Sequence, residues 1–129
     1  MPATWVAGTI DGVSVVLRLI SVRSAEAVLA GHTPVDVRVA TDYPTEFSVG
    51  VAERVGKGSP LGPYFLHRAA DDVVVGEIGG AIVSPGTAEI GYAVVPSCWG
   101  RGYATAAVRA LVGRARDVSG IDRLVAHTP

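Results

Sequence analysis

Cysteine is almost absent from the sequence, in which Cys98 is the only one among 129 residues. An internal disulfide is therefore impossible, and metal sites built from several cysteines are excluded. The histidines also lack the spacing of metal ligands, because they are scattered as His32, His67 and His127. We expect no metal site. We interpret Cys98 as a small, semi-buried thiol rather than a nucleophile, since no histidine lies near it in the sequence.

Charge of one sign and long hydrophobic runs are scarce as well. The formal net charge is only −1, whereas a protein that binds a nucleic-acid backbone usually carries a basic excess. No apolar run approaches the roughly 20 residues that a membrane span needs. The N-terminal residues contain neither the basic region nor the apolar segment of a signal peptide. We therefore expect a cytoplasmic protein that binds neither nucleic acid nor membrane.

The composition that remains is that of a folded domain. Hydrophobic residues make up 49% of the chain and charged residues 18%, which excludes general disorder. A chain of this length can bury about two-thirds of the surface that it exposes when unfolded. Internal repeats and low-complexity segments are missing. We expect a single domain over residues 1–129.

The first half of the chain alternates strand and helix signals. Residues 13–20 are β-branched and apolar and follow an Asp11-Gly12 turn signal, so we place the first strand there. Further expected elements are a short helix at 25–30 with Ser24 as its N-cap, an undecided extended piece or loop at 35–39, and a helix from Thr45 to Val55 that ends at the glycine-rich tip 56–60.

The second half predicts three strands joined by short turns, which favours an antiparallel meander. These strands are residues 63–68, 73–83 with a kink or bulge at Gly79-Gly80, and 89–95. A helix at 101–118 follows, with an apolar face made of Ala104, Ala107, Val108, Leu111, Val112, Ala115 and Val118. Because a helix joins them, the last strand, 121–126, should lie parallel to strand 89–95. The predicted fold class is α/β with a mixed sheet.

A glycine-rich loop, Trp99-Gly100-Arg101-Gly102-Tyr103-Ala104, connects strand 89–95 to the helix. The first N–H groups of a helix have no internal partner and lie at the positive end of its dipole, so they can bind phosphate. Glycines let a ligand approach the backbone, and Arg101 adds a guanidinium. The loop predicts an anion site, and an ordinary strand-to-helix turn is the alternative. A Rossmann site fits poorly, because Thr105 replaces its third glycine and the meander is not a repeated βαβ unit.

The stretch EIGYAVVPSCWGRGYATAAVRAL resembles the acyl-CoA-binding motif of the GNAT superfamily of N-acetyltransferases. It is most similar to the branch that acetylates ribosomal-protein N-termini. Trp99, Gly102 and Ala104 take the fixed places of the family pattern Gln/Arg-x-x-Gly-x-Gly/Ala, with Trp in the first place. In that family a further helix and a β-hairpin follow the strand equivalent to 121–126. The resemblance therefore implies a GNAT-like domain that is shortened at its C-terminus.

The resemblance also implies acetyl-CoA as co-substrate, with its pyrophosphate on the loop amides and its pantetheine along the preceding strand. The implied cofactor-binding residues are Val94, Val95, Trp99, Gly100, Arg101, Gly102, Tyr103, Ala104 and Thr105. Acyl transfer to an amine needs a general base and a donor for the oxyanion. Glu89 is our first candidate for the base, with an exposed structural carboxylate as the alternative, and Glu77 is the second. The amide of Val94 or Val95 is the expected oxyanion donor.

The sequence thus indicates an N-acyltransferase that moves acetyl from acetyl-CoA to a primary amine of a peptide N-terminus or a small molecule. The alternative is a non-catalytic acyl-CoA-binding or interaction module of the same fold. Residues 42–44 and the 56–60 tip are expected to flank the amine entrance. Because a shortened sheet would expose the edge of strand 121–126, we expect a homodimer in which residues 121–129 or the meander make the contact.

Overall fold

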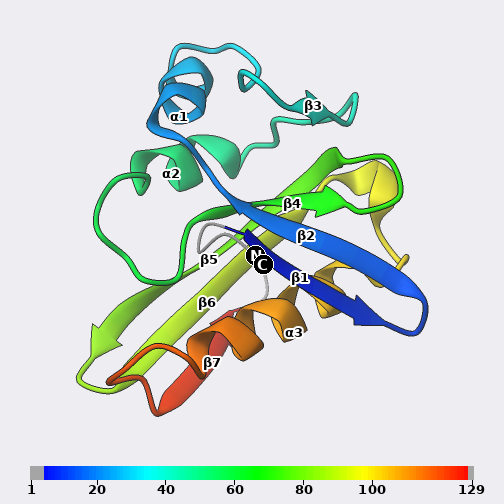
Figure 1. Ribbon diagram of the computed structural model, residues 1–129. Helices are drawn as coiled ribbons and strands as arrows, with labels where there is room; N and C mark the ends of the chain where they lie inside the picture. The colour runs from blue at the N-terminus through cyan, green and yellow to red at the C-terminus, as the bar shows by residue number, and fades with distance from the viewer. Residues whose placement is uncertain (1–4, 128–129) are drawn as a thin grey trace.

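The computed structural model of the protein describes residues 5–127, and strands that form one mixed sheet dominate it (Figure 1). In chain order the elements are β1 (Trp5–Ile10), β2 (Val13–Leu19), α1 (Val22–Leu29), β3 (Arg38–Val39), α2 (Ser48–Glu53), β4 (Tyr64–Arg68), β5 (Val73–Ser84), β6 (Thr87–Val94), the 3₁₀ helix η1 (Pro96–Cys98), α3 (Tyr103–Ala115) and β7 (Arg123–His127). The strand order is β1-β2-β4-β5-β6-β7, and the short β3 pairs with the start of β5. The predicted mixed α/β fold class is confirmed.

An N-terminal hairpin precedes the strand that we expected to be the first. β1 pairs antiparallel with β2 from Trp5 opposite Arg18 to Ile10 opposite Val13. The predicted turn residues Asp11 and Gly12 lie between the two strands, with φ of 50° and 78°, as a two-residue hairpin turn requires. β1 was missed because Gly8 interrupts its strand pattern. A Cβ on Gly8 would lie 2.8 Å from the Cβ of Ala110, so glycine is what lets β1 approach α3.

The predicted meander and the parallel last strand are confirmed. β4, β5 and β6 pair antiparallel in sequence order, and β7 pairs parallel with β6. A kink or bulge was expected at Gly79-Gly80; the bulge is wrong, because the β5–β6 register runs through both glycines and shifts only between Ile82 and Ser84. The two glycines instead make room for residues 61–63: a Cβ on Gly79 would lie 3.0 Å from the Cα of Pro63.

The helices exist near their predicted positions but with different ends. Ser21, not Ser24, caps α1: its side chain accepts from the Ser24 N–H, while the Ser24 hydroxyl is buried and donates to the carbonyl of Val35 at 3.0 Å. α2 is shorter than the predicted 45–55, because Thr45 belongs to a turn in which its N–H donates to the Ser48 hydroxyl at 2.9 Å. α3 begins only after Gly102, whose φ of 84° is left-handed.

The helices cover opposite faces of the sheet (Figure 1). α3 packs on one face against β1, β2, β5 and β6. α1 and α2 pack against each other on the other face, where Ser48 of α2 contacts Glu77 of β5. The core contains fully buried side chains from several strands and from α3, among them Leu17, Leu66, Ile78, Ile90 and Leu111. Burial of each such side chain contributes about 1.5–3 kcal/mol.

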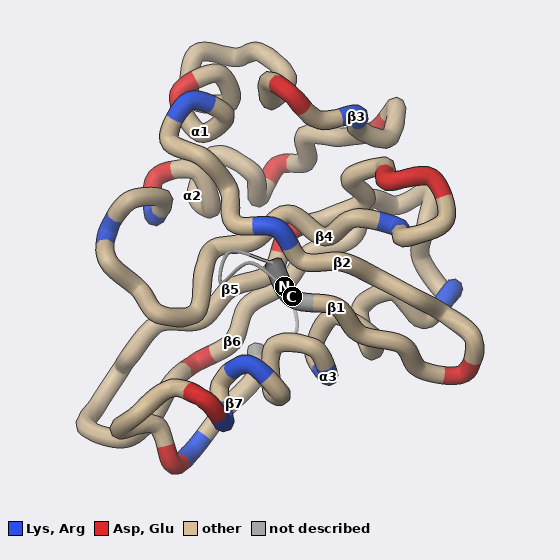
Figure 2. The backbone as a smooth tube through the Cα atoms, in the orientation of Figure 1, with Lys and Arg blue, Asp and Glu red and all other residues tan. Residues whose placement is uncertain are grey.

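Acidic and basic residues are interspersed over the chain (Figure 2). Within the described residues, no helix has the length and hydropathy to cross a membrane.

Candidate active site

Within residues 5–127, the C-terminal end of β6 has one open edge, without a strand partner. β5 pairs with β6 as far as Val94, whereas the β7 pairing within residues 5–127 ends at Gly91 opposite His127. The N–H of Val95 donates to the carbonyl of Val75 at 2.8 Å. Because backbone groups of neighbouring residues point to opposite sides of a strand, Val94 directs its N–H and C=O away from β5, toward the open edge. Of the two valines predicted to bind pantetheine, Val94 thus presents its backbone there, and the Val95 N–H is engaged within the sheet.

The glycine loop is tied back onto this edge. The indole N–H of Trp99 donates to the carbonyl oxygen of Val94 at 2.6 Å, although the Trp99 side chain is exposed, at 67% of its surface. The preceding helix η1 is held by Asp42, whose carboxylate accepts from both the N–H and the hydroxyl of Ser97 at 2.8 Å. The backbone hydrogen bond from Ser97 lowers the pKa of Asp42. The loop therefore leaves β6 in a defined direction.

The loop and the first turn of α3 present backbone donors. Gly100 and Gly102 have φ of 72° and 84°, which glycine adopts without strain. No atom lies within 4 Å of a Cβ built on Gly100, so a ligand can approach this residue closely. Arg101 and Thr105 are exposed. The N–H groups of residues 103–105 have no acceptor inside the helix. The predicted residues from Trp99 to Thr105 thus lie together at the start of α3, beside the open edge of β6.

A cavity of about 850 Å³ adjoins the open edge on the α2 face of the sheet. This volume is typical of small-molecule sites. β5 and β6 form its floor, with Glu77, Glu89 and residues 91–93 among the lining residues, and α2 with residues 57–60 forms its wall. Residues 57–60 of the predicted entrance segment 56–60 line the cavity, whereas residues 42–44 are not among its lining residues.

Both predicted carboxylates face this cavity. Glu77 is opposite Ala93 and Glu89 is opposite Ala81 in the β5–β6 register, and partners of this kind share one face of the sheet. The two glutamates are therefore four positions apart along the strands, about 13 Å. Glu89 is half-buried and precedes Gly91, the last residue of β6 paired with β7, by two residues.

Glu77 is held by two hydroxyl groups that sequence patterns did not reveal. Its side chain is only 2% exposed, and its carboxylate accepts from the Tyr43 hydroxyl at 2.6 Å and from the Ser48 hydroxyl at 3.2 Å. Burial raises the pKa of Glu77, and the two hydrogen bonds oppose that rise. Burial and the neighbouring Glu77 charge raise the pKa of Tyr43, which keeps its hydroxyl a donor. Tyr43 and Ser48 are 34 and 29 residues from Glu77 in the chain, so no local spacing could have indicated the cluster.

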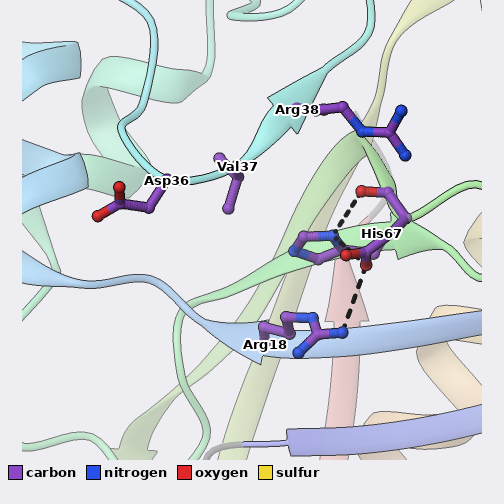
Figure 3. Close-up of a pocket in the computed structure, with 6 residues that line it drawn as sticks. Arg18, Asp36, Val37, Arg38 and His67 are labelled. Atoms are coloured by element: carbon purple, nitrogen blue, oxygen red, sulfur yellow. Dashed lines mark hydrogen bonds and ion pairs between the residues drawn. The ribbon is translucent and has the colours of Figure 1, made fainter.

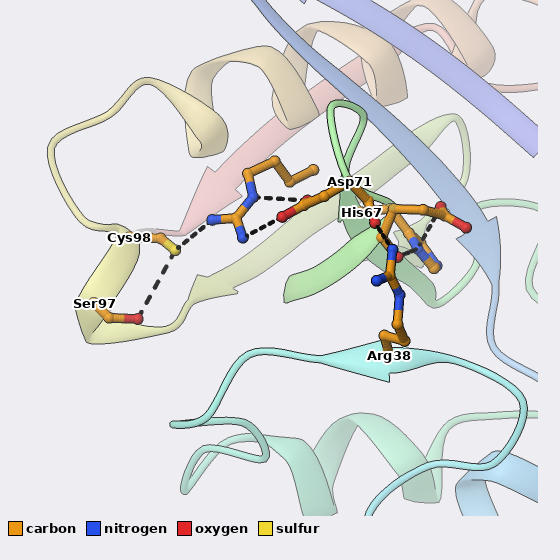
Figure 4. Close-up of polar contacts among 7 residues, drawn as sticks. Arg38, His67, Asp71, Ser97 and Cys98 are labelled. Atoms are coloured by element: carbon orange, nitrogen blue, oxygen red, sulfur yellow. Dashed lines mark hydrogen bonds and ion pairs between the residues drawn. The ribbon is translucent and has the colours of Figure 1, made fainter.

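Cys98 is a buried thiol at the end of η1, as the sequence predicted. Figure 4 shows its Sγ directed toward a guanidinium group, that of Arg68, at 3.7 Å. Arg68 in turn forms two hydrogen bonds of 2.8 and 2.9 Å with the carboxylate of Asp71. Cys98 does not line the cavity with the two glutamates, and it joins η1 to the end of β4.

His67 lies beside a separate, polar pocket, which Arg18, residues 36–38 and Asp72 also line (Figure 3). The His67 side chain is 1% exposed, and its Nδ1 lies 3.2 Å from the carbonyl oxygen of Asp72. Burial lowers the pKa of His67.

Across the described part of the chain, no three His, Cys, Asp or Glu side chains are grouped so that they could hold a metal ion.

Three solved acetyltransferase structures are similar to this chain in fold. A GNAT-family acetyltransferase from Bacillus anthracis superposes with a TM-score of 0.64 at 14% identity, covering 95% of this chain and 72% of its own. RimJ from Mycobacterium smegmatis, solved with CoA-disulfide, gives 0.60 at 20% identity with coverages of 95% and 66%. The microcin C7 self-immunity acetyltransferase MccE, solved with acetyl-CoA and AMP, gives 0.56 at 18% identity with coverages of 87% and 68%. At these identities the likeness concerns the fold, and the chain spans about two-thirds to three-quarters of each relative.

The sequence itself supplies the family assignment. Comparison with curated proteins gives no significant match. A family model described as an acetyltransferase (GNAT) domain, however, matches residues 16–129, which include the glycine loop, the open edge of β6 and both cavity glutamates. The chain therefore belongs to the GNAT acetyltransferase family.

Proposed function

We propose that the protein transfers the acetyl group of acetyl-CoA to a primary amine. The observation that carries this proposal is that the cavity with two glutamates lies over residues 91–93 of β6, where the strand becomes open at its edge. A thioester that follows the open edge and an amine that enters the cavity would meet there. Family membership supports the same reaction class.

The glycine loop and the edge of β6 would hold the cofactor. The pyrophosphate would accept hydrogen bonds from the amides of residues 100–105, with Arg101 as an additional cation. The pantetheine would run along β6 and pair with the C=O of Val94, which leaves the Val94 N–H for the thioester end of the cofactor. The relatives solved with CoA-disulfide or with acetyl-CoA and AMP support this choice of cofactor.

The reaction forms a C–N bond and breaks the C–S bond of the thioester. The amine must be neutral to attack, and it loses a proton as the tetrahedral intermediate collapses, while the CoA thiolate leaves and takes up a proton. We assign the general base to Glu89, directly or through water, because it is close to Gly91 and lines the cavity. Glu77 is the second candidate, although Tyr43 and Ser48 already hydrogen-bond its carboxylate. The Val94 N–H is the proposed donor to the oxyanion.

The test measures acetylated amine and released CoA thiol for a panel of amines, with CoA binding measured separately. Glu89→Gln should lower turnover by about 10²–10⁴-fold with little change in CoA affinity, the range for loss of a general base. Glu26→Gln, an exposed glutamate of α1 outside the cavity, is the control. CoA binding without turnover on any amine would indicate the non-catalytic module instead. Absence of CoA binding at millimolar concentration in folded protein would refute the cofactor assignment.

We further propose that the acceptor is a peptide N-terminus, as in the ribosomal-protein branch, or a small molecule. We also propose that the protein is cytoplasmic and forms a homodimer. Product analysis with peptide and small-molecule amines tests the acceptor. Cell fractionation tests the location, and sedimentation velocity at micromolar concentration tests the dimer. A sedimentation coefficient that corresponds to a monomer would contradict the dimer.

A further inference from the structure

Two cations stand on the wall of the cavity, apart from the two glutamates of its floor. Arg54 follows the last residue of α2, and Lys57 lies in the loop after it. Both residues are exposed, and Figure 2 shows basic residues on the loop that follows α2. The ion pairs within residues 5–127 involve other cations, namely Arg18, Arg23, His67 and Arg68. Arg54 and Lys57 thus belong to none of the ion pairs found within the described residues, although Glu77 and Glu89 line the same cavity.

The loop that carries Lys57 is anchored to the floor of the cavity. The hydroxyl of Ser59 donates to the carbonyl of Gly80 at 2.8 Å and accepts from the N–H of Leu61 at 3.2 Å. The N–H of Gly80 donates to the carbonyl of Leu61 at 2.8 Å. These contacts bind the loop to β5 on both sides of Pro60. Lys57 thus belongs to the cavity wall and is not on an independent tail.

Apolar side chains lie on the same cavity. Phe47, Ile82 and Val83 line it and are each about half exposed, and Val51 lines it from α2. Exposed apolar side chains of this size, gathered around one cavity, are typical of a binding surface. The cavity therefore combines three chemistries, namely carboxylates on the floor, apolar side chains, and cations on the wall.

We propose that the amine acceptor has an apolar body and an anionic group, a carboxylate or a phosphate, which Arg54 and Lys57 bind while the amine lies near the glutamates. This inference rests on the proposed acetyl transfer and names its substrate class. Charge complementarity supports it, because a cationic amine is attracted to the floor and an anion to the wall. Hydrogen bonds between charged groups are strong enough to change affinity about tenfold or more.

The experiment compares acceptors that differ only in the anion. Alanyl-leucine and alanyl-leucinamide form the carboxylate pair, in which the charge is remote from the reacting amine. An aminoalkyl phosphate and its parent amino alcohol form the phosphate pair. In at least one of the two pairs, we expect kcat/KM to be about tenfold or more higher for the anionic member than for the uncharged member, because its KM is lower. The pair that shows the difference identifies which anion is bound.

The variants locate that preference. In Arg54→Gln/Lys57→Gln the ratio between the two members should fall to about one, and in Arg54→Glu/Lys57→Glu the uncharged member should be preferred. Arg109→Gln, an exposed arginine of α3 outside the cavity, should retain the wild-type ratio. Equal use of both members of both pairs by the wild type would overturn the inference, as would a double variant that keeps the preference.

Calorimetry with each acceptor alone gives the same comparison without catalysis. If anionic acceptors bind more tightly than their neutral partners but nothing is acetylated, the proposed function fails and the anion site stands. If acetylation occurs with no preference in rate or binding, the anion site fails and the proposed function stands.

Discussion

The indole N–H of Trp99 donates a hydrogen bond of 2.6 Å to the carbonyl oxygen of Val94. Val94 is the residue whose backbone groups face the open edge of β6, and Trp99 is the first residue of the glycine loop. The exposed ring therefore occupies the acceptor that the proposed pantetheine position requires. A cofactor in the proposed position would compete with the indole for this carbonyl oxygen.

Trp99→Phe removes the donor and keeps an aromatic ring, which is smaller than the indole. We expect it to bind CoA about 2- to 10-fold more tightly than the wild type, because a typical hydrogen bond contributes about 0.5–1.5 kcal/mol net. Calorimetric titration with CoA measures the effect. In the wild type, CoA should also change tryptophan fluorescence as Trp99 leaves Val94. Weaker CoA binding by the variant would show that the indole supports the ligand and does not compete with it.

Gly102→Asp should abolish CoA binding, because a carboxylate would stand at the N-terminus of α3 where the pyrophosphate is proposed. The φ of 84° at Gly102 adds backbone strain of about 1–2 kcal/mol for any non-glycine residue. Gly120→Asp is the matched control, since Gly120 has a φ of 89°, an open surrounding and a position outside the loop. Calorimetry should find normal CoA binding in the Gly120 variant and none in the Gly102 variant. Equal binding in both would separate the anion site from this helix.

Tyr43→Phe leaves the buried Glu77 carboxylate with the Ser48 hydroxyl as its remaining side-chain donor within the described residues. We expect a loss of about 1–3 kcal/mol of stability at neutral pH, the cost of an unsatisfied buried group. Urea unfolding followed by circular dichroism measures it. Tyr64→Phe is the control, because within the described residues that buried tyrosine shows no side-chain hydrogen bond.

The pH dependence of this loss has a definite sign. Burial raises the pKa of Glu77 above its ordinary value of 4.5, so the folded protein holds the Glu77 proton more tightly than the unfolded chain does. The contribution of protonated Glu77 to stability is therefore complete below pH 4.5 and is lost as the pH rises through the folded-state pKa. Removing the Tyr43 donor raises that pKa further, since the hydrogen bond lowers it. The difference between Tyr43→Phe and wild type should therefore grow from pH 4.5 to pH 7. A difference that is constant with pH would show that Glu77 does not titrate in this way.

His67→Gln tests a pH effect of the opposite direction. Burial lowers the pKa of His67 below its ordinary value of 6.5, while Asp72 favours the charged ring and Arg18 opposes it. In the unfolded chain His67 takes up a proton near pH 6.5, whereas in the folded protein it does so only at lower pH. The contribution of neutral His67 to stability is therefore complete above pH 6.5 and is lost as the pH falls. The slope is at most about 1.4 kcal/mol per pH unit. Urea unfolding between pH 7.5 and 5.5 should give a flatter profile for His67→Gln, whereas His32→Gln, at an exposed site, should keep the wild-type slope.

Local sequence determined the elements whose signals lie within a few residues. The strands of the meander are bounded by turn residues. The glycines between β6 and α3 mark a loop, because glycine readily adopts the left-handed conformation that Gly102 has before the first turn of α3. The parallel β7 followed from its helical connection to β6. The glycine loop and the two candidate glutamates could therefore be named from the sequence.

Tertiary structure decided what long-range packing controls. β1 was missed because Gly8 weakens its strand pattern, and only contact with Ala110 explains that glycine. Which carboxylate is buried could not be read from Glu77 or Glu89 themselves, since the burial of Glu77 depends on hydroxyl donors from a distant segment. The cavity and its cations arise where α2 and its loop fold back over β5. A spacing pattern describes neighbours along the chain, whereas these contacts join residues that only the completed sheet brings together.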